Sequence, residues 1–279
     1  WFGGGLRQSM KFDDVKVIPF VLPSLTEQKE IAQYLDTKTA QIDRKIDLLT
    51  QKAQRYEELK KSLINETVTR GLDKSVSMKD SAIEWIGEIP EHWELKRHKD
   101  NFQLVTKRCE NRSLVKVGLE NIESQTGRFI ETESEFDGDG IEFKPNDILF
   151  GKLRPYLAKV YLSDFRGSAV GDIFVYRPRP NLNPTFSRHL MLSHKYIDVI
   201  NSSTIGAKMP RVSSSFIANL AIATPPLSEQ EYIANHLDAK ISRIERIIQT
   251  IKTNIDKQKE LRKTLINDVV TGKIKVIDN

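Results

Sequence analysis

The chain has 279 residues, 39% of them hydrophobic and 29% charged, so it can bury a sizeable core and still carry long exposed helices. It has no apolar run of about eighteen residues and no signal-like start, which argues against a membrane or secreted protein. The single cysteine, Cys109, excludes intrachain disulfides and cysteine-type zinc sites, so a reducing cytoplasmic location is expected. The net charge of +5 indicates a polyanionic partner only weakly.

Residues 1–22 resemble the end of a domain. A polar loop that follows Gly5 and contains Arg7 precedes the apolar segment 15–22, just as a loop after Gly206 precedes the apolar segment 220–224. Each of these segments leads through proline into a long helical sequence. Residues 1–22 are therefore expected to be the C-terminal remnant of a domain whose body this chain lacks.

A long helix is predicted at residues 23–72, and its sequence returns at residues 225–279. We call Pro23–Thr69 the first repeat and Pro225–Thr271 the second; they align without a gap over roughly twenty identical pairs. In both, apolar residues recur with the heptad spacing of a coiled coil. The predicted seam consists of Leu35, Ile42, Ile46, Leu49 and Leu63 in the first repeat and Leu237, Ile244, Ile248, Ile251 and Leu265 in the second.

The ends of both helices are marked in the same way. Thr26 and Ser228 are candidate N-caps, and Gly71 and Gly272 follow the last apolar positions. Each helix would be a rod of roughly 60 to 65 Å at about 1.5 Å per residue. Two matching seams in one chain predict an antiparallel coiled coil; the alternative is that each helix packs separately on its own domain.

The insert, residues 73–224, has a mixed α and β pattern. It opens with the aromatic anchors of the segment 83–93. Strands are predicted at 114–119, 147–153, 158–162 and 169–176, with a helix at 185–200. The overall fold class is therefore α+β, with a mixed domain flanked by two long helices.

Charge divides the insert into two halves. Residues 80–143 contain 8 basic and 15 acidic residues, whereas residues 144–224 contain 11 basic and 4 acidic ones. Basic side chains on glycine- and serine-rich loops can neutralise phosphates and reach base edges. The sequence therefore predicts a DNA-binding surface made of Lys152, Arg154, Tyr156, Lys208 and Arg211, with Arg7 in the equivalent loop at the chain start. Solvated charges without a partner are the alternative for each.

The doubled helix, the segment 83–93 and the segment 147–157 together resemble the specificity subunit of a type I restriction-modification system. The resemblance covers essentially the whole chain. It implies that the insert is a target-recognition domain that reads one half of a bipartite site in double-stranded DNA. It also implies that the helices set the spacing between half-sites and dock two methyltransferase subunits, through which restriction subunits join. S-adenosylmethionine and ATP would then belong to those partner subunits, and this chain would hold no cofactor.

No catalytic or metal site is predicted. Asn183-Pro184-Thr185-Phe186 resembles the Asn-Pro-Pro-aromatic motif of amino-methyltransferases, but no glycine-rich loop precedes it, and a helix start explains it better. Asp139, Glu142 and Lys144 are too closely spaced for a metal nuclease and fit a hairpin turn. Two alternatives to a DNA-reading subunit stay open: a coiled-coil assembly scaffold without DNA readout, and a stand-alone methyltransferase or nuclease.

Overall fold

The computed structural model describes residues 12–18, 21–132 and 138–276, and these residues form two compact units. The first unit contains residues 1–55 and 247–279, and the second contains residues 56–246. Two long helices, α2 (Leu25–Arg70) and α7 (Leu227–Val270), contribute to both units. In the described ranges, no helix is long and apolar enough to cross a membrane.

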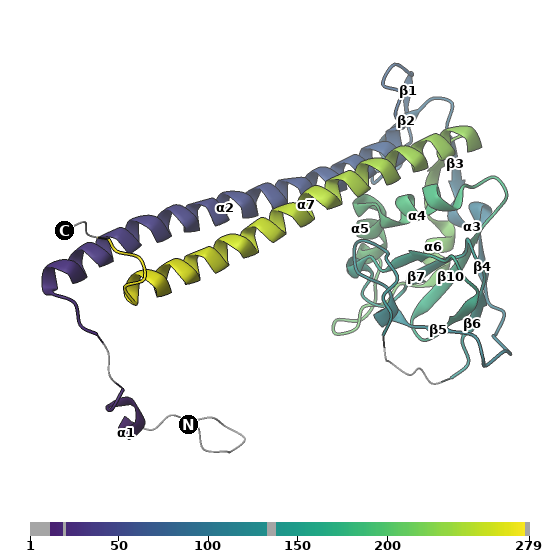
Figure 1. Ribbon diagram of the computed structural model, residues 1–279. Helices are drawn as coiled ribbons and strands as arrows, with labels where there is room; N and C mark the ends of the chain where they lie inside the picture. The colour runs from purple at the N-terminus through teal and green to yellow at the C-terminus, as the bar shows by residue number, and fades with distance from the viewer. Residues whose placement is uncertain (1–11, 19–20, 133–137, 277–279) are drawn as a thin grey trace. The chain divides into compact units, whose positions relative to one another are not determined.

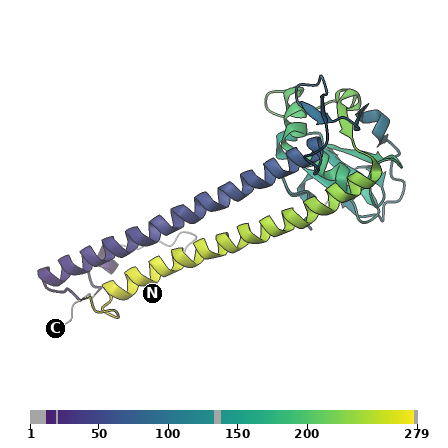
Figure 2. The same cartoon turned by 90° about the horizontal axis from the view of Figure 1, so that it is seen from above.

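In the first unit, the N-terminal part of α2 lies beside the C-terminal part of α7, and the two helices run in opposite directions (Figures 1 and 2). The Arg262 guanidinium contacts the Asp43 carboxylate at 2.9 Å across the pair. Of the seam residues, Ile248 and Ile251 are buried, whereas Leu35, Ile42, Ile46, Leu49 and Leu265 are partly buried. The predicted antiparallel coiled coil is confirmed.

The second unit contains the insert with the adjoining ends of both helices. Lys60 on α2 lies 3.6 Å from the Glu245 carboxylate on α7. Compared with the pair of Asp43 and Arg262, the residue on α2 is later in the chain and the residue on α7 is earlier, as antiparallel helices require. Ile244 is buried, while Leu63 and Leu237 pack in the same hydrophobic cluster as the insert. The end of the first seam and the start of the second therefore also pack in the core of the insert.

The insert is built around a four-stranded antiparallel sheet in the order β4-β10-β7-β8. A three-stranded sheet, β5-β9-β6, combines one parallel and one antiparallel pairing, and two antiparallel two-stranded sheets, β1-β2 and β11-β3, complete the set. The strands are β1 (Met78–Asp80), β2 (Glu88–Pro90), β3 (Glu94–Arg97), β4 (Phe102–Val105), β5 (Lys116–Val117), β6 (Ile141–Phe143), β7 (Ile148–Gly151), β8 (Val160–Leu162), β9 (Gly167–Ala169), β10 (Ile173–Pro178) and β11 (Ala221–Thr224). The shorter helices are α1 (Phe12–Val15), α3 (His98–Asn101), α4 (Pro184–Leu192), α5 (His194–Ser202) and α6 (Ser214–Asn219), with 3-10 turns η1 (Leu119–Asn121) and η2 (Pro155–Leu157).

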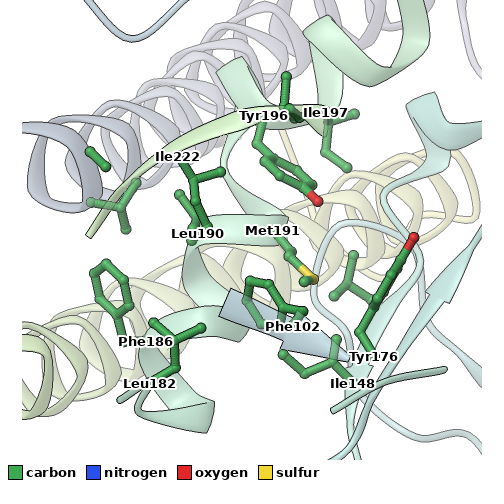
Figure 3. Close-up of a cluster of buried hydrophobic side chains, with 14 of the residues drawn as sticks. Phe102, Ile148, Tyr176, Leu182, Phe186, Leu190, Met191, Tyr196, Ile197 and Ile222 are labelled. Atoms are coloured by element: carbon green, nitrogen blue, oxygen red, sulfur yellow. The ribbon is translucent and has the colours of Figure 1, made fainter. Parts of the chain in front are cut away.

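The main core lies where α4 and α5 cover the sheet. Figure 3 shows the side chains that meet there from the sheet and from these two helices. The labelled members are Phe102, Ile148, Tyr176, Leu182, Phe186, Leu190, Met191, Tyr196, Ile197 and Ile222, all of them buried. Val68 of α2 and Ile233, Ala234 and Leu237 of α7 belong to the same cluster. The helix ends are thus part of the insert's core.

Three predicted elements of the insert differ from those observed. The predicted strand 114–119 is only Lys116–Val117, and Leu119 begins η1. The predicted strand 169–176 is two strands, because the left-handed backbone of Gly171 (φ +68°) interrupts the extended conformation between β9 and β10. These two strands belong to different sheets. The predicted helix 185–200 is α4 and α5, because Ser193 is extended and its hydroxyl donates to the Leu190 carbonyl at 2.7 Å.

Residues 1–22 are described only in part, because 1–11 and 19–20 lie outside the described residues. The start of α1 lies as many residues before α2 as the start of α6 lies before α7. The described residues of the apolar segment 15–22 contain no strand. Its counterpart β11 pairs with β3 of the insert, and such a pairing supplies the backbone hydrogen bonds that a strand needs.

We expect aspartate at both Ile46 and Ile248 to lower the free energy of unfolding by at least about 3 kcal/mol, because a carboxylate would replace apolar contacts in the seam. Circular dichroism during thermal unfolding measures this loss. The control is Leu48→Asp with Leu261→Asp, whose parent side chains are 57% and 51% exposed on the same helices. Equal melting of both double variants would contradict the seam.

We also expect the stability of the insert to fall below pH 6.5 because of His98. Burial lowers the pKa of His98 from 6.5 to about 3, and its ring stacks on Phe102 at 4.4 Å between centroids. Between pH 6.5 and pH 3 the unfolded chain binds a proton on His98 and the folded chain does not. The contribution of neutral His98 to the free energy of unfolding is therefore fully present above pH 6.5 and is lost as the pH falls. From pH 6.5 to pH 5 the loss is about 2 kcal/mol.

His98→Phe should make the pH dependence shallower in urea unfolding at pH 7 and pH 5, since it keeps the stacking and removes the titrating group. Val115→Ser, a change between non-titrating side chains at a site that is 56% exposed, is the control and should leave the slope unchanged. An unchanged slope in His98→Phe would show that another group causes the acid sensitivity.

Candidate DNA-binding surface

Two neighbouring loops carry the five predicted DNA-binding residues that lie in the insert. The first loop runs from β7 through η2, and the second connects α5 to α6. The Arg154 N–H donates to the Pro210 carbonyl at 2.8 Å, and the Val212 N–H donates to the Lys152 carbonyl at 3.1 Å. The structure therefore brings together residues that are far apart in sequence: Lys152, Arg154, Tyr156, Lys208 and Arg211.

The first loop has a strained backbone. Arg154 and Ala158 lie on either side of η2 in the left-handed region, at φ 49° and 46°. Gln125, also left-handed at φ 67°, donates from its backbone N–H to the Leu157 carbonyl and from its side chain to the Tyr156 carbonyl. Such a conformation costs about 1–3 kcal/mol per non-glycine residue and is retained where the surroundings enforce it. The result is a rigid loop that presents Tyr156, which is 47% exposed.

Asp172 holds the base of both loops. The sequence did not predict this role for it. Arg211 donates to the Asp172 carboxylate from Nε at 3.1 Å and from Nη2 at 2.8 Å. The Lys152 ammonium lies 3.7 Å from the same carboxylate, and the Lys152 N–H donates to the Asp172 carbonyl at 2.9 Å. The hydrogen bond from Arg211 is the main reason why the pKa of Asp172 lies below its ordinary value.

The five residues therefore fall into two groups. Lys152 and Arg211 are tied to Asp172, and the ammonium of Lys152 also lies 5.4 Å from the centroid of the Phe174 ring. Arg154 and Lys208 carry no side-chain ion pair within the described part of the chain, so their charges are available to an outside anion. Arg7, the sixth predicted residue, lies outside the described residues.

The two segments with an enzyme-like pattern have structural roles. The Asn183 side chain accepts a hydrogen bond from the Phe186 N–H at 2.9 Å, which makes it the N-cap of α4. Glu142 accepts from Arg166 Nε at 2.8 Å, and Asp139 lies 4.0 Å from Arg108. Among the described residues, no group of three or more histidine, cysteine, aspartate or glutamate side chains could hold a metal ion.

The start of the second repeat holds the insert through polar contacts. Gln230 is fully buried; its side-chain oxygen accepts from the Asn183 N–H at 2.8 Å, and its amide donates to the Asn181 carbonyl at 3.1 Å. Glu229 accepts from the Trp93 indole at 3.1 Å. Glu229 and Gln230 therefore bind the insert to the start of α7.

About two turns further along α7, Asp238 makes a second polar contact with the insert. Its carboxylate lies 2.8 Å from both the Arg188 guanidinium and the His189 ring. Burial lowers the pKa of His189, and the hydrogen bond from His189 is the main cause of a lowered pKa for Asp238. A neutral imidazole therefore donates to an ionised carboxylate.

The first repeat has the same residue types without these contacts in the described residues. Gln28 donates to the Pro23 carbonyl at 2.8 Å, which matches the bond from Gln230 to the Pro225 carbonyl at 2.8 Å. Glu27 and Asp36 are exposed. The two repeats are thus alike in sequence, and the second one holds an insert.

The corresponding glutamines of the two repeats supply a matched test. We expect Gln230→Ala to lower the free energy of unfolding of the insert by about 2–3 kcal/mol, because it removes a fully buried side chain and leaves the Asn183 N–H and the Asn181 carbonyl without this partner. Gln28→Ala, which removes only the local bond to Pro23, should cost about 0.5 kcal/mol or less. Urea denaturation followed by tryptophan fluorescence measures both, since Trp93 is buried beside Glu229. Equal costs would mean that Gln230 does not hold the insert.

Comparison with solved structures shows the fold. The chain aligns with a protein from a structure described as the basis of complex assembly and conformational transition of the type I R-M system, with TM-score 0.68, 14% identity, and coverage of 91% of this chain and 61% of the other. It also aligns with the HsdS subunit of Thermoanaerobacter tengcongensis, with TM-score 0.56, 14% identity, and coverage of 98% and 65%.

Sequence comparison gives the family. The chain is 22% identical to the type I restriction enzyme EcoDI specificity subunit of Escherichia coli and 25% identical to the MjaVIII specificity subunit of Methanocaldococcus jannaschii. These matches cover 94% and 95% of this chain but 63% of each relative. Residues 90–257, more than half of the chain, match the type I restriction modification DNA specificity domain. The protein therefore belongs to the family of type I restriction-modification specificity subunits.

Proposed function

We propose that this chain reads one half of a bipartite site in double-stranded DNA and supplies that specificity to partner enzymes without catalysing a reaction itself. The observation that carries the proposal is the meeting of Lys152, Arg154, Tyr156, Lys208 and Arg211 on two hydrogen-bonded loops. Arginine and lysine bind phosphates, and arginine, lysine and tyrosine can also contact base edges. Family membership supports the same function.

The partners follow from the same proposal. Two methyltransferase subunits would dock on or beside the paired helices, and restriction subunits would join through them. S-adenosylmethionine and ATP would be bound by those subunits. The exposed faces of α2 and α7 support such docking, because both helices are long, exposed over much of their length and similar in sequence.

A second recognition domain is part of the proposal. The second repeat holds the insert through Glu229, Gln230 and Asp238, and the first repeat has the corresponding Glu27, Gln28 and Asp36. We infer that the first repeat holds a domain of the same type in the whole protein. The relatives, of which this chain spans 63%, have room for one.

The test is DNA binding by the full chain. Duplexes that the chain selects from a random-sequence pool should bind more tightly than unselected ones. Lys208→Ala and Arg154→Ala should each weaken binding by about 1–3 kcal/mol, and a substitution that removes a phosphate contact should reduce the slope of log K against log salt by about one unit.

Lys240→Ala is the matched control, since Lys240 is an exposed lysine on α7. It should leave both the affinity and the salt slope unchanged. A chain that selects no duplex, with or without its partner subunits, would favour the alternative function of a coiled-coil scaffold.

A further inference from the structure

The second loop of the DNA-binding surface is a narrow hairpin. Ile205 and Arg211 face each other and exchange two backbone hydrogen bonds of 3.0 Å. Gly206 makes the turn at φ +103°, a conformation that favours glycine. We call residues 204–212 the hairpin; it projects from the domain beside α5 (Figure 1).

Large apolar side chains of the hairpin are exposed. Ile205 is 80% exposed, which makes it the most exposed large apolar side chain among the described residues of the insert. Met209, on the other arm, is 46% exposed, and Tyr156 of the adjoining loop is 47% exposed. Apolar groups gathered on a projecting element are a typical sign of an interaction site.

The charges around these exposed apolar side chains favour a polyanion. Lys152, Arg154, Lys208 and Arg211 lie on the hairpin or on the loop bonded to it, and Asp172 contacts Lys152 and Arg211. Because Arg211 and Lys152 neutralise Asp172, the positive charge of the surface is in excess. Exposed apolar side chains with cations beside them fit duplex DNA better than the apolar face of a protein, where unpaired cations would be desolvated.

The base of the hairpin is fixed. Arg211 uses Nε and Nη2 for Asp172, so this edge of its guanidinium cannot form the fork that recognises guanine. Its backbone also bonds to Ile205 and forms a bridge with Leu153. Arg211 is therefore held at the base of the hairpin, and its predicted contact with DNA stays a prediction.

We propose that the hairpin is a DNA wedge: Ile205 and Met209 enter a groove and partly unstack one base step, while Lys208 and Arg154 contact the flanking phosphates. This inference rests on the proposed function and specifies how the same surface contacts DNA. Isoleucine and methionine are among the side chains that proteins insert between base pairs from the minor groove. Arg211 and Asp172 act as positioning residues that hold the wedge.

The experiment uses the full chain without partner enzymes and a duplex that it selects from a random-sequence pool. 2-Aminopurine, whose fluorescence rises when it is unstacked, replaces bases at successive positions. We expect the fluorescence to rise at one step in the complex. Ile205→Ser with Met209→Ser should abolish the rise and weaken binding about tenfold, a loss in the range of one stacked base.

Val115→Ser is the matched control, because Val115 is 56% exposed elsewhere on the same domain. It should change neither the fluorescence nor the affinity. Thermal unfolding should be the same for all these variants, since the replaced side chains are largely exposed. If binding by the wild type leaves every position stacked, the wedge is wrong while the DNA-binding function stands.

A second readout tests the positioning role. Asp172→Asn and Arg211→Ala should reduce the fluorescence rise but select the same duplex sequence as the wild type, whereas loss of a base-reading arginine relaxes the preference at one position. A changed preference in Arg211→Ala would overturn its positioning role. Failure of the chain to select any duplex would overturn both the wedge and the proposed function. If the hairpin variants lose a modification subunit and keep full DNA binding, the hairpin binds protein instead.

Discussion

The insert depends on apolar side chains that the two long helices contribute to its core. Val68 near the end of α2 and Ile233 and Leu237 near the start of α7 are all fully buried in the cluster that contains the insert's aromatic residues. Burial of a side chain of this size stabilises the fold by about 1.5–3 kcal/mol. The insert and the adjoining helix ends therefore form one compact unit, residues 56–246.

The same constraint explains why polar residues occur at the start of a helix that also carries a coiled-coil seam. Buried backbone groups must be hydrogen-bonded, and the turn before α4 exposes the Asn183 N–H and the Asn181 carbonyl towards α7. The fully buried amide of Gln230 satisfies both. Each repeat thus combines two functions in one sequence: an apolar stripe for the other helix and polar groups for a domain.

The loops that bear the basic residues show a similar division between support and exposure. Asp172 and the strained backbone at Arg154 fix the base of the surface, which leaves Tyr156, Lys208 and Ile205 exposed. Rigid support lowers the conformational entropy that would be lost on binding. Four positive charges placed on free loops would repel one another; the single carboxylate of Asp172 offsets this repulsion for Lys152 and Arg211.

The sequence by itself determined the features that depend on local spacing. The heptad register of Ile244, Ile248 and Ile251, the glycines after the long helices and the α+β pattern of the insert could be predicted, because apolar periodicity and turn residues act within a few positions along the chain. The predicted N-caps Thr26 and Ser228 were wrong, since α2 begins at Leu25 and α7 at Leu227. Asn183 as a helix start is a further case, since capping involves residues only three apart. The clustering of basic residues in one half of the insert was also visible.

Only the tertiary structure decided which distant residues meet. The pairing of Asp172 with Arg211, the contact of Gln230 with Asn183 and the left-handed backbone of Arg154 and Ala158 have no local signal, because each depends on packing between segments far apart in the chain. The interruption at Gly171 also depends on long-range packing, because β9 and β10 on either side of it belong to different sheets. Side-chain type set the available chemistry, and long-range packing decided which charges are held inside the surface and which face outwards.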